Sequence, residues 1–176
     1  MAIFVPMNLP YPALCAAFTG HRTYRREADA AICRSIAELH AAGVRTFMSG
    51  MAVGFDLAAA EAVLDCRQQL PGLRLAAVVP FRGQQERFSD GDRERFARIW
   101  AAADERIMLA ERYYPACYLR RDDWLVAHAG TLISWYDGSP GGTRYTLERA
   151  LNSGRRLLHL HPNTPPEVMM QLALFQ

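Results

Sequence analysis

Short apolar runs alternate with longer helical stretches along almost the whole chain, and no other feature constrains the fold as much. Six runs are predicted to be buried strands: residues 14–18, 44–48, 73–79, 106–109, 131–135 and 156–160. The stretches between them are predicted to be helical: residues 27–42, 56–69, 90–103, 118–129 and 143–152, with a further helix after Thr164. Strands that are apolar on both faces are typical of a parallel sheet covered by helices on both sides. We therefore predict an α/β, doubly wound, mainly parallel sheet of about six strands, forming a single domain over residues 1–176.

Several classes of protein are excluded by composition. Mean hydropathy is -0.09 and no apolar run approaches the ~18 residues of a membrane span, so we expect no membrane segment. The N-terminus has no basic region and is interrupted by prolines, unlike a signal peptide. The four cysteines are scattered, without a C-x-x-C pair, and the histidines lack metal-ligand spacing. We therefore expect a cytoplasmic protein with no bound metal.

The charge balance argues against two further groups of functions. The chain has 20 basic residues, all of them arginine, against 18 acidic residues, which gives a net charge of +2. Without lysine, neither a P-loop lysine nor a Schiff-base lysine exists. A net charge this small is also far from that of a dedicated nucleic-acid binder, so we do not expect a nucleic-acid partner.

Unusual residues gather directly after three of the predicted strands. Parallel sheets bind ligands at the carboxyl ends of their strands, at the point where the strand order reverses. There the chain has T-G-H-R over residues 19–22, S-G-M-A-V-G-F-D over 49–56 and Y-D-G-S-P-G-G-T over 136–143. Glycine-rich loops that lead into a helix can place backbone N–H groups against a phosphate, although tight turns alone would also need the glycines. The loop residues predicted to bind ligand are Gly20, Ser49, Gly50, Met51, Ala52, Gly54, Gly138, Gly141, Gly142 and Thr143.

Polar and aromatic side chains near these loops supply further candidates. Arg22 can pair with a phosphate, and His21 can bind ligand or cap a turn. Asp56 can accept hydrogen bonds from a ribose or base, or serve simply as a helix N-cap. Arg121 can clamp a phosphate or be a solvated cation. Tyr136, followed by Asp137, can stack on a base.

The same segments resemble the SLOG superfamily, the Rossmann-like group that includes the DprA/Smf proteins, the LOG phosphoribohydrolases and the YspA/YpsA-like proteins. The chain is most similar to the YspA/YpsA-like family, whose function is poorly defined. The matching pieces are F-T-G-H-R (residues 18–22), S-G-M-A-V-G-F-D-L-A-A-A-E (49–61), A-V-V-P-F (77–81) with Gln84 and Gln85, C-Y-L-R-R (117–121) and W-Y-D-G-S-P-G-G-T-R-Y-T (135–146). The resemblance implies a Rossmann-like fold and a pocket for a nucleotide or nucleotide-derived ligand. Our interpretation is that the protein binds a small nucleotide-type ligand as a sensor or regulator.

Two alternative functions follow from the same resemblance. LOG enzymes hydrolyse the N-glycosidic bond of nucleoside monophosphates with a P-G-G-x-G-T-x-x-E motif and an upstream arginine. This chain has P-G-G-T-R-Y-T-L-E, so Glu148 falls two positions late, while Arg121 matches the upstream arginine. An enzyme of this type would use Asp56 or Glu148 as its acid or base. DprA proteins, which share the segment around residues 49–56, bind single-stranded DNA, and this gives the second alternative.

The helical stretch R-E-R-F-A-R-I-W over residues 93–100 is a candidate contact between copies of the chain. A solvated face is the alternative. A homo-oligomer through this stretch is therefore an expectation of the sequence.

Overall fold

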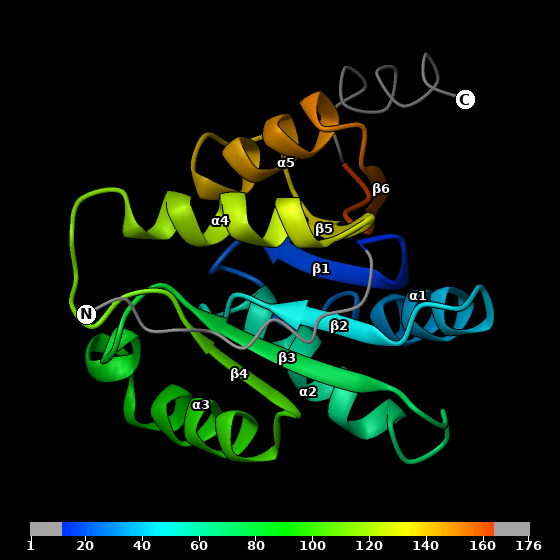
Figure 1. The fold of residues 1–176 in the computed structure, drawn as a ribbon, viewed down its shortest axis with the longest axis horizontal. Coiled ribbons are helices and arrows are strands. Elements are labelled where there is room, and N and C mark those ends of the chain that lie inside the picture. Colours follow the sequence, from blue (N-terminus) through cyan, green and yellow to red (C-terminus); the bar gives the residue numbers. More distant parts are fainter. Residues whose placement is uncertain (1–11, 164–176) are drawn as a thin grey trace.

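Six parallel strands form one sheet at the centre of the molecule (Figure 1). The computed structural model describes residues 12–163. The sheet order is β4-β3-β2-β1-β5-β6, and every neighbouring pair is parallel. The strands are β1 (Cys15–Gly20), β2 (Thr46–Ser49), β3 (Arg74–Val79), β4 (Glu105–Met108), β5 (Thr131–Trp135) and β6 (Arg156–His159). The predicted α/β, Rossmann-like, parallel sheet of six strands is confirmed.

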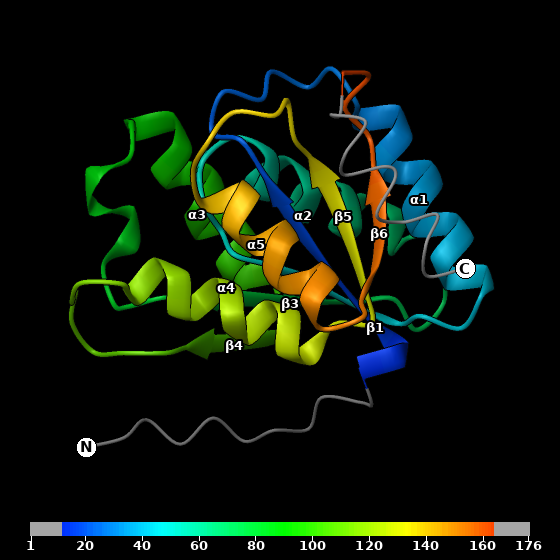
Figure 2. The same ribbon diagram turned by 90° about the horizontal axis from the view of Figure 1, so that it is seen from above.

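Helices cover both faces of this sheet, as Figures 1 and 2 show from two directions. One face carries α1 (Asp29–Ala41), α2 (Phe55–Cys66) and α3 (Asp90–Ala102), and the other carries α4 (Cys117–His128) and α5 (Gly142–Asn152). Two short 3-10 helices, η1 (Pro12–Leu14) and η2 (Gln84–Arg87), precede β1 and α3. The chain therefore winds outward from β1 in both directions.

The strands supply two hydrophobic cores because successive side chains point to opposite faces. In β1, Ala16 and Phe18 pack beneath α1 and α2, whereas Cys15 and Ala17 pack beneath α4 and α5. Phe18 stacks on Phe47 of β2 with ring centroids 6.0 Å apart. A strand buried on both sides needs apolar residues at every position, which explains the continuous runs in the sequence.

The strand order reverses at β1, which lies between β2 and β5. The chain leaves β1 towards α1 on one face and leaves β5 towards α5 on the other. The two connections diverge, and this opens a crevice at the carboxyl ends of β1 and β5.

Local side-chain contacts move some helix ends from their predicted positions. Helix α1 begins at Asp29 rather than residue 27, where the Tyr24 hydroxyl accepts from the Ala28 N–H at 2.9 Å and donates to Asp29 at 2.6 Å. Helix α2 begins at Phe55 with Gly54 as its N-cap, so Asp56 lies in the first turn and is not the cap. The predicted helix after Thr164 lies outside the described residues.

Helix α3 contains the candidate contact between copies. Phe96 and Ile99 of this helix are buried in the core, and Trp100 stacks on Phe96 with ring centroids 5.9 Å apart. The apolar side chains of the stretch therefore lie against this chain's own core, and a contact between copies through it would involve its charged face.

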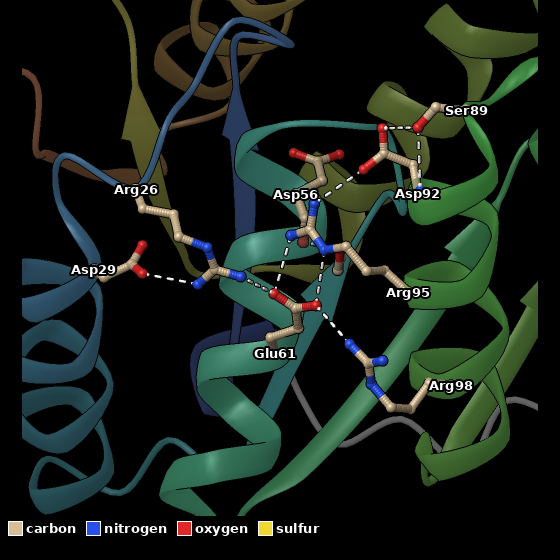
Figure 3. Close-up of polar contacts among 9 residues, drawn as sticks. Arg26, Asp29, Asp56, Glu61, Ser89, Asp92, Arg95 and Arg98 are labelled. Atoms are coloured by element: carbon tan, nitrogen blue, oxygen red, sulfur yellow. Dashed lines mark hydrogen bonds and ion pairs between the residues drawn. The ribbon is translucent and has the colours of Figure 1, made fainter.

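A single carboxylate on α2 binds α3 and the segment that precedes α1 (Figure 3). Glu61 of α2 accepts from Arg26 at 2.6 Å, from Arg95 at 2.9 Å through two nitrogens and from Arg98 at 3.2 Å. Burial raises the pKa of Glu61, but the hydrogen bonds and charges of Arg95 and Arg26 outweigh this and hold it below its ordinary value. Glu61 therefore has a structural partner set and no evident link to a ligand.

No helix within residues 12–163 combines the length and the apolar character needed to cross a bilayer. In the same part of the chain, no group of three or more histidine, cysteine, aspartate or glutamate residues is arranged to hold a metal ion.

Candidate functional site

A cleft of about 580 Å³ opens at the carboxyl ends of β1 and β5, between the loops that follow these strands and the starts of α4 and α5. Its position agrees with the general rule for ligand sites in open α/β sheets. The predicted site residues that line the cleft are Gly20, His21, Arg22, Ala52, Asp56, Arg121, Asp137, Gly142 and Thr143. The other predicted ligand-binding residues, Ser49, Gly50, Met51, Gly54, Tyr136, Gly138 and Gly141, do not line it.

The loop after β2 lies beside the cleft and is held in shape by its own hydrogen bonds. The Ser49 hydroxyl accepts from the Met51 N–H at 3.1 Å and donates to the carbonyl of Asp56 at 2.8 Å. Met51 has a left-handed backbone with φ 59° and a fully buried side chain. The Met51 amide, one of those expected to hold a phosphate, is therefore occupied within the loop.

Arg121 of α4 fastens this loop to the rest of the site. Its Nη1 donates to the carbonyl of Gly50 at 2.5 Å, and its Nε donates to Asp122 Oδ1 at 2.7 Å. A Cβ on Gly50 would lie 2.6 Å from that Nη1 and 2.8 Å from Asp56 Oδ2, so a side chain there would have to displace the ends of both buried side chains. Arg121 thus lies beside Gly50, and Oδ2 of Asp122 lies 3.7 Å from the position of a Cβ on Gly142 at the start of α5.

The carboxyl group of Asp56 is the most unusual group in the cleft. The residue is 5% exposed, and its Oδ1 has no hydrogen-bond partner among the described residues. Burial raises its pKa to about 7, although the Arg121 charge opposes this. The pKa of Asp122 is raised too, again by burial. Two buried carboxyls beside one guanidinium favour a proton on one of them.

Arg121 stays charged in this setting. Burial lowers its pKa, but the carboxylates of Asp122 and Asp56 more than offset the effect, and the pKa lies above its ordinary value. The sequence left open whether Arg121 binds ligand or is solvated. The structure places it in the wall of the cleft with both partners inside the protein.

The start of α5 lines the cleft, and no side chain caps its first N–H groups. Its N-cap is Gly141, which has φ 143° and no side chain to accept from the first N–H groups. Gly142 and Thr143 of the first turn line the cleft. The first N–H groups of a helix have no partner inside the helix and attract an anion.

The loops after β1 and β5 are tied to each other. His21 Nε2 lies 2.8 Å from Asp137 Oδ1 and 3.2 Å from the Asp137 N–H. Asp137 also accepts from the N–H and hydroxyl of Ser139 at 2.9 and 2.6 Å. His21 and Asp137 therefore shape the mouth of the cleft by holding its two rims together.

Arg22 is the exposed cation of the site. Within residues 12–163 it forms no ion pair, and its guanidinium lies over the Tyr118 ring, 5.8 Å from the centroid. Its backbone is fixed by Gly54, where a Cβ would come within 2.6 Å of the Arg22 carbonyl. Arg22 can therefore turn towards a ligand without losing an internal ion pair.

Glu148, a predicted acid or base, lies outside the cleft, whereas several residues that were not predicted line it. Glu148 lies on an exposed part of α5, paired with Arg144 at 2.8 Å, and it does not line the cleft. The cleft-lining residues outside the predicted site are Phe18, Thr19, Thr23, Tyr118, Leu119, Asp122 and Ser139. Thr19, Thr23 and Ser139 lie in or beside the predicted loops, so extending those loops would have found them. Nothing in the local pattern around residues 118–122 indicates which side of α4 meets the cleft.

Comparison with known proteins places the chain in a family. The family described as the YspA SLOG family matches residues 16–158. The chain belongs to this SLOG family. The SPbeta prophage-derived protein YoqJ of Bacillus subtilis (strain 168) is 28% identical over 131 residues, which cover 66% of this chain and 77% of that protein. The chain spans little more than half the length of several UPF0398 proteins that it matches.

Two solved structures share the fold of this SLOG chain. One is DNA processing protein A from Helicobacter pylori, described by its single-stranded DNA binding mode, with a TM-score of 0.62 and 18% identity. It is matched over 85% of this chain and 65% of its own chain. The other is the molybdenum cofactor carrier protein of Chlamydomonas reinhardtii, with a TM-score of 0.55 and 16% identity over 94% of this chain and 85% of that protein. At these identities the likeness concerns the fold alone.

Proposed function

We propose that the cleft binds a nucleotide or nucleotide-derived small ligand and that the protein acts as a sensor or regulator. The phosphate would lie against the open amides of Gly142 and Thr143, with Arg22 as the mobile counter-charge. Asp56 would accept a hydrogen bond from the sugar or the base. In this proposal the loop after β2 supports the wall and does not hold the phosphate, because the Met51 N–H and the Gly50 carbonyl are already hydrogen-bonded within the protein.

The observation that carries the proposal is the buried, unpartnered Oδ1 of Asp56 in the wall of a cleft whose other side has uncapped helix amides. A buried acceptor without a partner costs about 1–3 kcal/mol. A ligand that donates a hydrogen bond to it would remove that cost. Ribose hydroxyls and a phosphate on one molecule would satisfy both sides of the cleft.

A charge placed at Gly142 tests the proposal. A Cβ there would have Asp122 Oδ2, 3.7 Å away, as its nearest neighbour, so a side chain fits. We expect Gly142→Asp to weaken adenosine 5′-monophosphate binding at least tenfold in calorimetry, while the fold is kept. Gly142→Asn, which has nearly the same size and no charge, is the control. Unchanged affinity in Gly142→Asp would contradict the site, and native mass spectrometry of the fresh protein would reveal any co-purified nucleotide.

N-glycosidic hydrolysis of a nucleotide is a second candidate, favoured by the pKa of about 7 of Asp56. A carboxyl that holds its proton near neutral pH can donate it to a leaving base while water attacks the sugar. The assay is release of free base from nucleoside monophosphates. Activity that is lost in Asp56→Asn and kept in Glu148→Gln would support this candidate, because Glu148 does not line the cleft.

Single-stranded DNA is a third candidate ligand, since the Helicobacter pylori protein with the same fold is described as binding it. The small net charge of +2 speaks against it. Mobility shifts with oligonucleotides at low salt, weakening steeply as salt is added, would support DNA binding. The absence of shifts at low salt would dismiss it.

A further inference from the structure

A second hollow of about 560 Å³ adjoins the cleft, and we call it the aromatic hollow. Its walls include Phe81, Phe88, Tyr113 and Tyr118, with Gln84 and Arg22 also lining it. The ring of Phe81 meets those of Tyr113 and Tyr118 edge to face, with centroids 5.5 and 5.9 Å apart. Aromatic walls of this kind suit a planar ring, which can stack on them.

The nitrogen of the Gln84 side-chain amide has hydrogen-bond partners, whereas its oxygen has none among the described residues. Its Nε2 donates to the carbonyl of Met51 at 2.7 Å and to that of Gly50 at 3.4 Å. Because two carbonyls require a donor there, the orientation of the amide is fixed and Oε1 points away from them. The residue is 4% exposed, and Oε1 has no partner among the described residues. Because Gln84 lines the aromatic hollow, the wall of the hollow includes a residue with a buried, unpaired hydrogen-bond acceptor, Oε1.

The two cavities are neighbours that share residues. Arg22 and Tyr118 line both, so the contact between this guanidinium and this ring forms the boundary between them. The Gly50 carbonyl accepts from Arg121 on the cleft side and from Gln84 on the other. Asp56 lines the cleft and Gln84 lines the aromatic hollow, so each cavity has one residue with a buried oxygen that lacks a partner among the described residues.

The charges around the hollow favour a neutral ring over a second phosphate. Arg87 lines it together with Glu86 and Asp92, so acidic and basic side chains are mixed there. Gly142 and Thr143, the first residues of α5, line the cleft and do not line the aromatic hollow.

We propose that the aromatic hollow is the base subsite for the ligand whose phosphate lies at the start of α5, and that it selects bases with an exocyclic amino group. The amino group would donate to Gln84 Oε1, and the base would stack on the aromatic side chains. This inference rests on the proposed function and names the class of ligand: nucleotides with adenine-like or cytosine-like bases. A base with a keto oxygen at the same position would place a hydrogen-bond acceptor against Gln84 Oε1, which is also an acceptor, and no hydrogen bond would form.

Matched nucleotide pairs test the selection. Adenosine and inosine 5′-monophosphates differ by an amino or keto group at one carbon, as do cytidine and uridine 5′-monophosphates. Calorimetry should show the amino member of at least one pair binding about tenfold tighter or more, because a buried unpaired acceptor disfavours the keto member. Gln84→Met should reduce that ratio towards one. Equal affinities within both pairs for the wild-type protein would overturn the proposal.

Replacing Tyr113 tests the stacking of the base, and it should leave the fold intact because this residue is 63% exposed. Tyr113→Ser should weaken adenosine 5′-monophosphate binding about fivefold or more and leave ribose 5-phosphate binding unchanged. Tyr114→Ser is the matched control, because Tyr114 is the next residue and lines neither cavity. If wild-type protein bound neither ribose 5-phosphate nor any of the four nucleotides, the proposed function would fail as well. Binding of ribose 5-phosphate with no effect of Tyr113→Ser on the nucleotides would overturn the base subsite alone.

Discussion

Arg121 and Gly50 are 71 positions apart in the sequence and are joined by a 2.5 Å hydrogen bond from the guanidinium to the backbone carbonyl. The contact links α4, on one face of the sheet, to the loop that leads into α2 on the other. Arg121 also binds Asp122 and lies beside Asp56, so one side chain organises the charges in the wall of the cleft.

Gly50→Ala should destabilise the protein by about 1–3 kcal/mol, as expected when a packed site is overfilled. The added Cβ would stand 2.6 Å from Arg121 Nη1 and would displace a buried charge. Urea unfolding measures the change. Gly91→Ala in α3 is the control, because a Cβ there meets nothing within 4 Å and should stabilise the helix by up to about 1 kcal/mol. Similar stability of the two variants would contradict the packing role of Gly50.

Arg121→Gln should cost about 3–5 kcal/mol, because it leaves buried carboxylates without their counter-charge. Adding Asp122→Asn to this variant should restore part of the loss, since the carboxylate that has lost its ion-pair partner is then removed. Chemical unfolding of the two single variants and the double variant gives the coupling energy. Strictly additive effects would mean that the 2.7 Å pair does not act as a unit.

Asp56→Asn should alter how stability depends on pH. Burial raises the folded-state pKa of Asp56 to about 7, so the folded protein holds this proton more tightly than the unfolded chain. The resulting stabilisation is complete below about pH 4 and is lost as the pH rises through about 7. Wild type should therefore lose stability relative to Asp56→Asn over this window, by at most about 1.4 kcal/mol per pH unit. A difference that stays constant from pH 4 to 8 would contradict the buried, neutral carboxyl.

Glu61→Gln should destabilise the protein by about 1–2 kcal/mol at pH 7, because it weakens the charge-assisted bonds that join α2 to α3 and to the segment before α1. Glu148→Gln removes an exposed pair within α5 and should cost only about 0.5 kcal/mol. Because the pKa of Glu61 is lowered, its contribution should disappear in acid as the carboxylate is protonated. Equal losses in the two variants, measured by urea unfolding, would show that the Glu61 contacts add nothing beyond surface charge.

Most of the fold could be predicted because it is encoded in local patterns. The strand Thr131–Trp135 lies at its predicted position, and the other strands lie within about two residues of theirs. Continuous apolar runs and helical spacing reflect burial on both faces of a sheet, which each segment expresses in its own residues. The position of the cleft follows from the same information, since the carboxyl ends of parallel strands meet at one edge.

The partners of the polar groups could not be predicted in this way. No local pattern indicates that Arg121 would donate to the Gly50 carbonyl or that Gln84 would donate to the Met51 carbonyl. These contacts join segments that are far apart in the sequence and come together only when the chain packs. Likewise, the glycines at 50 and 142 look equivalent in sequence, yet the first is covered by Arg121 and the second lines the cleft. Residue types and spacing thus specify the sheet and the edge that carries the site. Which amides, carboxyls and rings are left open to a ligand depends on contacts between distant segments, and these form when the whole chain packs.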